Sequence, residues 1–164
     1  METASQIPKS AAPERILGWR EWLELPGFGI PAIKAKIDTG ARTSALHAHE
    51  LEYFRRARRE WVRFWIHPLQ HDAQLMMRCE TPIIDRRTVS DSGGHRERRY
   101  VIETPVRVAG VEWTIEVTLT RRDGMLFRML LGRTGIAGRF LVDPRRSFVT
   151  GRPDIKALYP EASK

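Results

Sequence analysis

The sequence predicts an all-β fold, either a barrel or a sandwich, on two observations. First, apolar and polar residues alternate with a period of two, most clearly over residues 111–119, where every odd-numbered position is apolar. Second, turn-forming residues separate several short apolar segments, as at Pro26-Gly27, residues 91–94 and Asp123-Gly124. With 164 residues, of which 41% are hydrophobic, the chain is long enough for one domain with a substantial core.

The elements are predicted from the same two signals. In chain order, we expect strands at residues 16–19, 22–25, 32–37, 61–66, 83–89, 100–108, 111–119, 126–131, 140–142 and 148–149. Ala109-Gly110 predicts the turn of a hairpin between two of them. The stretch 46–65 also fits helical spacing loosely, but its aromatic and β-branched residues cluster at one end, which favours strand–loop–strand.

The domain boundaries follow from composition. Residues 1–14 are polar with two prolines and are expected to be a disordered lead, residues 15–150 form the domain, and residues 151–164 are expected to be a flexible tail. No apolar run is long enough for a membrane helix or a secretory signal. The single Cys79 has no partner for an internal disulfide, which suits a reducing compartment. The expected location is therefore cytoplasmic.

The charge is strongly basic and is carried almost entirely by arginine. The net charge is +8, and 23 of the 28 basic residues are arginines. The guanidinium fork binds carboxylates and phosphates in bidentate fashion, so an acidic peptide or a nucleic acid is a plausible partner. The plainer alternative is a solvated surface that happens to be rich in arginine.

The segment Asp38-Thr39-Gly40 holds the residues most suggestive of chemistry. An apolar strand precedes Asp38, so its carboxylate is expected to project from a strand end into a cleft. Thr39 can brace the loop, and Gly40 permits close approach of a substrate backbone. An ordinary turn capped by the aspartate is the structural alternative. In the C-terminal half, Leu130-Leu131-Gly132-Arg133 forms a second candidate motif.

Together these two motifs resemble the retropepsin-like aspartic peptidases. Further matches, including Leu17-Gly18-Trp19-Arg20-Glu21-Trp22 and Leu141-Val142-Asp143-Pro144, resemble the small bacterial family commonly labelled "ATP-dependent zinc protease", which is associated with RimK-type glutamate ligases. The resemblance covers roughly residues 16–150. It implies a closed β-barrel with one short helix near the Leu-Leu-Gly-Arg motif, and an aspartic-type endopeptidase.

The resemblance also implies roles for individual residues. Asp38, Thr39 and Gly40 would form the catalytic loop, which Leu130, Leu131, Gly132 and Arg133 would support. Tentative substrate-binding residues are Arg42, Ser44, Arg96, Arg98 and Arg99, and a tentative flap comprises Asp91, Ser92, Gly93 and Gly94. The implied partners are a peptide or protein substrate, with an acidic peptide as one candidate, and a RimK-type ligase or a ribosomal protein.

The residues themselves predict no cofactor. No Gly-x-x-x-x-Gly-Lys-Ser/Thr stretch is present to hold ATP phosphates, and there is no His-Glu-x-x-His helix. Zinc would have to use the pair His47 and His49 or the pair His67 and His71. A zinc site needs three or four ligands, and neither pair has an obvious completing group.

Aspartic proteolysis needs a second carboxylate. Asp91 and Asp143 are candidates within the chain, but the first lies in a polar hairpin and the second lacks the glycine. We therefore expect a homodimer in which Asp38 of each subunit meets on a two-fold axis. The competing class is a non-catalytic basic β-domain that binds RNA or the ribosome through residues 55–59 and Trp61, or that regulates a glutamate ligase.

Overall fold

The computed structural model describes residues 15–91, 93–121 and 126–162. Its elements are β1 (Arg15–Leu17), β2 (Arg20–Leu25), the 3-10 helix η1 (Pro26–Phe28), β3 (Ile30–Asp38), β4 (Ser44–His47), β5 (His49–Arg56), β6 (Arg59–Ile66), β7 (Met77–Pro82), β8 (Asp85–Ser90), β9 (Arg96–Val108), β10 (Val111–Thr120), β11 (Met129–Gly132), α1 (Arg133–Ile136), β12 (Phe140–Val142) and α2 (Ile155–Leu158). The all-β prediction is confirmed, and α1 directly follows the Leu-Leu-Gly-Arg motif.

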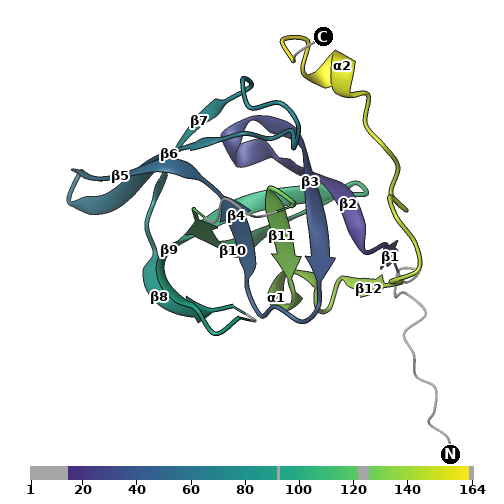
Figure 1. The fold of residues 1–164 in the computed structure, drawn as a ribbon, viewed down its shortest axis with the longest axis horizontal. Coiled ribbons are helices and arrows are strands. Elements are labelled where there is room, and N and C mark those ends of the chain that lie inside the picture. Colours follow the sequence, from purple (N-terminus) through teal and green to yellow (C-terminus); the bar gives the residue numbers. More distant parts are fainter. Residues whose placement is uncertain (1–14, 92, 122–125, 163–164) are drawn as a thin grey trace, which may run out of the picture.

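The central sheet closes into a barrel (Figure 1). Its strand order is β10-β4-β11-β3-β2-β9-β8, and an additional antiparallel pairing of β9 with β10 joins the ends of the six-strand ring. Closure leaves β8 as an extra strand on β9. Within the ring, β3 lies between β2 and β11, so the strand that ends in Asp38 is supported on both sides.

The alternation over residues 111–119 arises from this closure. Trp113, Ile115, Val117 and Leu119 of β10 are buried in the core, while the residues between them up to Glu116 face outward. The hairpin at Ala109-Gly110 is also confirmed, because both residues have positive φ (53° and 76°) and join paired strands. That conformation matches the two-residue turn that follows the natural twist of a hairpin.

A second sheet, β5-β6-β7, extends from the barrel. The stretch 46–65 is strand rather than helix, as expected, and Val62, Phe64 and Ile66 of β6 are fully buried on one face. The sequence patterns did not predict β7. Its buried residues are Cys79 and Thr81, which alternate with the charged residues Arg78 and Glu80. Polar residues at outward positions of a half-buried strand hide the apolar signal.

Two segments near the C-terminus differ from the expectations. Phe148–Val149 was expected to be a strand, but it is irregular and Phe148 has a positive φ of 53°. In place of a featureless tail, residues 155–158 form α2, and Tyr159 beyond it is buried at 5% exposure. The Tyr159 hydroxyl donates to the Ala32 carbonyl, so a long-range contact orders this segment.

Several expectations lie outside the described residues: the lead at 1–14, Ser92 of the tentative flap, and the turn at Asp123-Gly124. The strand expected at residues 126–131 begins later than predicted, since β11 starts at Met129. None of the described helices is long and apolar enough to cross a membrane.

Candidate active site

Asp38 is the last residue of β3, and its carboxylate is fixed by the loop that follows. Its Oδ1 accepts hydrogen bonds from the backbone N–H groups of Gly40 at 2.9 Å and Ala41 at 3.2 Å. Its Oδ2 makes no hydrogen bond to the described part of the chain. The carboxylate is thus oriented through one oxygen while the other remains available, and the residue is partly exposed.

Gly132 brings β11 against this loop. It is paired with Asp38 in the parallel β3–β11 ladder, and its N–H donates to Ser44 Oγ at 3.0 Å. A Cβ at this position would lie 2.5 Å from the backbone carbon of Thr43, far inside van der Waals contact. Only glycine permits this approach, which explains the glycine of the Leu-Leu-Gly-Arg motif. Leu131 is fully buried and Leu130 is half-buried.

The start of α1 completes the support of the loop. The Arg133 N–H donates to the Ala41 carbonyl at 2.7 Å, and the Thr134 N–H donates to the Arg42 carbonyl at 3.0 Å. The Arg133 side chain donates from Nη1 to the Thr39 carbonyl at 3.0 Å. The carbonyl groups of Thr39, Ala41 and Arg42 thus accept hydrogen bonds from Arg133 and Thr134, which pairs these peptide groups of the loop.

The tentative substrate-binding residues fall into two groups. Arg42, Arg96 and Arg98 are exposed. Ser44 is fully buried beneath the loop, and Arg99 is 8% exposed, with its side chain donating to Glu97 and Thr118. The period-two pattern of β9 separates Arg99 from Arg98, because successive side chains of a strand point to opposite faces.

The described residues of the predicted flap, Asp91, Gly93 and Gly94, lie between β8 and β9. Asp91 Oδ1 accepts from the N–H groups of Gly93 at 2.9 Å and His95 at 2.8 Å. Gly94 has a φ of 86°, a conformation that favours glycine. Asp91 therefore organises its own turn.

The other candidate for a second carboxylate, Asp143, is also engaged locally. It forms an ion pair with Arg145 (Arg145 Nε to Asp143 Oδ1, 3.1 Å) and accepts from the Arg145 backbone N–H. These hydrogen bonds from Arg145 lower the pKa of the Asp143 carboxyl. A carboxyl held ionised in this way is a poor proton donor, so Asp143 does not suit the protonated half of a dyad.

The histidines are arranged differently from the two sequence-based pairs. His47, His49 and His67 stack edge to face, with ring centroids 4.5 Å apart for the first pair and 4.4 Å for the second. The β5–β6 pairing brings His67 to His49, which local spacing does not reveal. Within the described ranges, no group of three or more His, Cys, Asp or Glu is arranged to hold a metal ion.

Cys79 is not a suitable nucleophile. Its thiol is buried, and burial raises its pKa to about 12. The thiolate is the reactive form of cysteine, and it is scarcely populated at neutral pH with such a pKa.

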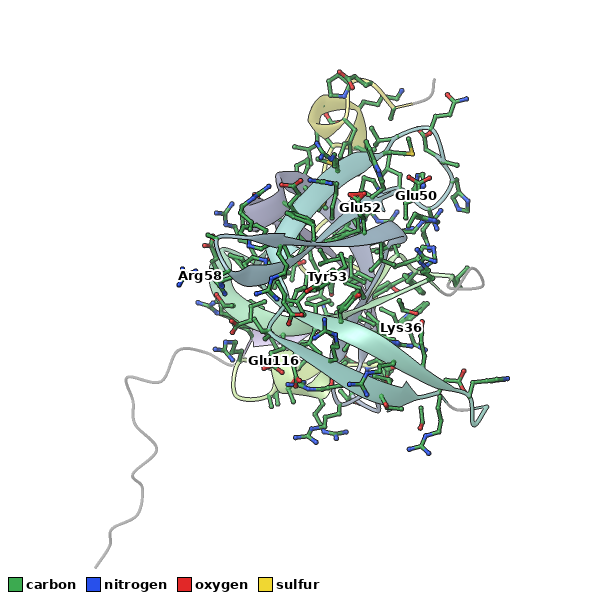
Figure 2. The ribbon with its side chains drawn as sticks, turned by 90° about the vertical axis from the view of Figure 1, so that its left-hand side faces the viewer. Lys36, Glu50, Glu52, Tyr53, Arg58 and Glu116 are labelled. Carbon is green, nitrogen blue, oxygen red and sulfur yellow. The ribbon has the colours of Figure 1, made fainter. Side chains whose placement is uncertain are left out.

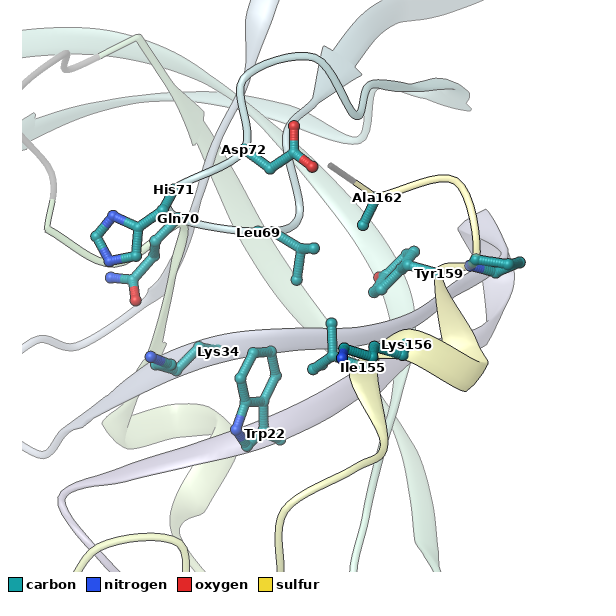
Figure 3. Close-up of a pocket in the computed structure, with 11 residues that line it drawn as sticks. Trp22, Lys34, Leu69, Gln70, His71, Asp72, Ile155, Lys156, Tyr159 and Ala162 are labelled. Atoms are coloured by element: carbon teal, nitrogen blue, oxygen red, sulfur yellow. The ribbon is translucent and has the colours of Figure 1, made fainter. Parts of the chain in front are cut away.

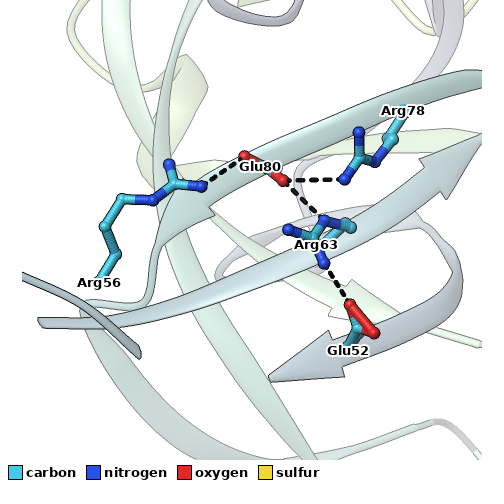
Figure 4. Close-up of polar contacts among 5 residues, drawn as sticks. All are labelled: Glu52, Arg56, Arg63, Arg78 and Glu80. Atoms are coloured by element: carbon cyan, nitrogen blue, oxygen red, sulfur yellow. Dashed lines mark hydrogen bonds and ion pairs between the residues drawn. The ribbon is translucent and has the colours of Figure 1, made fainter. Parts of the chain in front are cut away.

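Three arginines of the β5-β6-β7 sheet form ion pairs with two glutamates. Glu80 receives contacts from Arg56, Arg63 and Arg78, and Arg63 also pairs with Glu52 (Figure 4). Glu52 and Tyr53 lie along the outer hairpin that ends near Arg58 (Figure 2). Within the candidate nucleic-acid segment 55–59, Arg56 pairs with Glu80 and lies 4.6 Å from the Trp61 ring centroid, whereas Arg55, Arg58 and Arg59 form no ion pair with the described residues. Part of this basic cluster is thus engaged with an acid, which reduces its suitability as a nucleic-acid surface.

A closed barrel in which a Leu-Leu-Gly-Arg strand holds an Asp-Thr-Gly loop is the architecture of a retropepsin-like aspartic peptidase. The model of the family described as "RimB-like: Retropepsin-like aspartic endopeptidase RimB" matches residues 16–153. The chain belongs to this RimB-like family.

Named relatives and a solved structure agree with this placement. The chain is 44% identical over 147 residues to a "Probable alpha-L-glutamate ligase" of Shewanella pealeana and 45% identical to one of Parasynechococcus marenigrum. Each match covers 88% of this chain and 32% of the relative, so the chain spans about a third of these longer proteins. A crystal structure of a Legionella pneumophila protein of unknown function is similar with a TM-score of 0.70 and 25% identity, covering 84% of this chain and 99% of that one.

Proposed function

We propose that this protein is an aspartic-type endopeptidase whose catalytic water is activated between two Asp38 carboxylates of a homodimer. The observation that carries the proposal is the Asp38 loop: one carboxylate oxygen is fixed by two backbone donors, and the other is available at the end of a supported strand. The family match supports the same class of chemistry.

In the proposed reaction, one Asp38 is ionised and removes a proton from water while the other is protonated and donates to the scissile carbonyl oxygen. The new C–O bond gives a tetrahedral intermediate, which expels the amine as the C–N bond breaks and the nitrogen takes up a proton. Two carboxylates at close range cannot both ionise, so the dyad titrates as one unit with two separated pKa values.

The two-stranded β1–β12 sheet supports the dimer. Ile16 and Leu141 are paired in this parallel ladder, and their side chains are 38% and 52% exposed. A two-stranded sheet is marginal by itself, and its unpaired edges accept further strands. Apposition of this sheet with its copy would cover these two side chains.

We further propose an acidic, glutamate-rich peptide as the substrate. Arg42, Arg96 and Arg98 are exposed and form no ion pair with a carboxylate of the described chain. The names of the relatives point the same way, because similar sequence there forms part of a protein called a probable glutamate ligase. Those names also support the second candidate, a non-catalytic domain that regulates such a ligase.

The test is hydrolysis of a peptide ending in several glutamates, followed by mass spectrometry, with the parent protein and Asp38→Asn. We expect cleavage by the parent and none by the variant, because an amide cannot serve as the base. Asp85→Asn, which alters an exposed ion pair on β8, is the matched control and should cleave normally. Full activity in Asp38→Asn would exclude the mechanism, and an inactive parent that binds a ligase would favour the regulatory function.

A further inference from the structure

A pocket of about 880 Å³ lies away from the Asp38 loop, at the outer face of β2 and β3. Trp22 and Lys34 border it on one side, the loop around Leu69 on another, and α2 with Tyr159 on a third (Figure 3). Its volume falls within the range of small-molecule and side-chain binding pockets. None of its lining residues belongs to the catalytic loop at 38–43.

The pocket has a rigid apolar wall. Tyr159 accepts a hydrogen bond from the Ala32 N–H at 3.2 Å and donates to the Ala32 carbonyl, which anchors the segment beyond α2 to β3. Burial raises the pKa of Tyr159 to about 12, so the ring carries no charge at neutral pH. Trp22, Leu69 and Ile155 supply further apolar surface. An apolar side chain is the group that this wall would accommodate.

A cluster of three cations adjoins this wall. The cationic ends of Arg20, Lys34 and Arg152 lie 4.8, 5.8 and 4.4 Å from the centroid of the Phe148 ring. Lys34 also lies 5.3 Å from the Trp22 ring centroid. No carboxylate from residues 15–91, 93–121 or 126–162 forms an ion pair with any of the three.

The fold holds these like charges together. Partial burial and the nearby charges of Arg20 and Arg152 lower the pKa of Lys34. The buried carboxylate of Glu21 accepts from the N–H groups of Val149 and Thr150 and fixes the segment that carries Phe148. Aromatic faces moderate the repulsion, yet only an incoming anion would neutralise the cluster.

Lys34, the member of the cluster that belongs to β3, lies on the same face of this strand as Asp38. Side chains of β3 alternate, so Lys34, Lys36 and Asp38 point to the same side while Ala35 and Ile37 are buried. Lys34 and Asp38 are four positions apart along β3, a distance of about 13 Å at 3.3 Å per residue. An extended peptide of about four residues covers the same length.

We propose that this pocket binds an acidic segment of the substrate that also carries a large apolar side chain. The apolar group enters between Trp22 and Tyr159, and neighbouring carboxylates pair with Lys34, Arg20 and Arg152. The identity of the ligand as substrate rests on the proposed function, but binding itself requires no catalysis. The pocket would therefore select substrates at a distance from the bond that is cut.

The test measures binding to the full chain carrying Asp38→Asn, so that hydrolysis does not interfere. Fluorescence anisotropy would compare three labelled peptides: a glutamate run with one leucine, the same run with alanine in its place, and the leucine peptide with glutamine replacing glutamate. We expect the first to bind best. Adding Lys34→Gln should weaken its binding about tenfold, the effect of losing one charge-assisted contact.

Two further variants make the result specific. Lys156→Gln removes an exposed charge at the pocket and should also weaken binding. Arg58→Gln removes the same charge from the β5–β6 turn and should leave binding unchanged. Equal affinities of the Lys34→Gln and parent proteins, or equal affinities for the three peptides, would overturn the proposal. Selective binding by a parent protein that cleaves nothing would overturn the peptidase function and retain the pocket.

Discussion

At the residue scale, Ser44 links two of the strands that support the Asp38 loop, β4 and β11. Its hydroxyl is fully buried and accepts the Gly132 N–H, which belongs to the strand beside Asp38. Polar groups buried in this way are paired because an unpaired one has lost its bonds to water. A single hydroxyl therefore fixes the distance between β4 and β11 directly below the loop.

Replacing Ser44 by alanine leaves the Gly132 N–H buried without its acceptor. We expect a loss of about 1–3 kcal/mol in the free energy of unfolding. Chemical denaturation of the variant and the parent would measure this loss. Ser90→Ala, on the exposed surface of β8, is the matched control and should change stability little. Equal stabilities of the Ser44 and Ser90 variants would contradict the role assigned to this hydroxyl.

At the scale of elements, the β5-β6-β7 sheet is held on its outer face by arginine–carboxylate contacts. Hydrogen bonds from Arg63 and Arg56 lower the pKa of Glu80 below its ordinary value of 4.5. Cross-strand pairs of opposite charge stabilise neighbouring strands where they face each other. In this sheet they also engage Arg56, one of the arginines of the segment 55–59 that resembles a nucleic-acid surface.

The Glu80 network makes stability depend on pH. Because the folded pKa is lowered, the contribution of Glu80 is present above the unfolded value of 4.5 and is lost as pH falls through the folded value. We expect the free energy of unfolding to decrease in acid, and to decrease less in Glu80→Gln. Denaturation at pH 7 and at about pH 3.5 would measure both.

Glu103→Gln is the control for this experiment, since Glu103 is exposed and forms no ion pair within the described residues. Its pH dependence should match that of the parent. If Glu80→Gln loses as much free energy of unfolding in acid as the parent, the ion pairs of Glu80 do not contribute to the pH dependence of stability.

At the scale of the whole molecule, the proposed dyad requires two copies. The exposed pair Ile16 and Leu141 on the β1–β12 sheet is the surface we assign to that contact. In an isologous interface the same patch occurs on both subunits, so one charge introduced here appears twice.

Leu141→Glu should therefore shift the protein towards monomer in analytical ultracentrifugation and reduce peptide hydrolysis in parallel. Leu158→Glu, which alters an exposed leucine of α2, should leave both unchanged. An active Leu141→Glu monomer would show that the second carboxylate comes from the same chain.

Local patterns of the sequence predicted much of this structure. Alternation over 111–119 predicted β10, and the Ala109-Gly110 turn predicted its hairpin. The loop at Asp38 and its partner strand were also singled out, because glycine at a close approach leaves a recognisable motif. In contrast, β7 and α2 were missed: charged residues hide the apolar signal of β7, and the segment of α2 is anchored through Tyr159 to the distant Ala32.

Local sequence patterns were sufficient to predict the all-β class, most of the barrel strands and the resemblance to the family to which the chain belongs. Those patterns did not reveal which arginines form ion pairs, that Ser44 and Arg99 are buried, or that Arg20, Lys34 and Arg152 meet around Phe148. The reason is physical. Backbone periodicity and turn conformation depend on neighbouring residues, whereas charge pairing and pockets depend on residues that folding brings together, 17 positions apart for Arg63 and Glu80 and 127 for Ala32 and Tyr159.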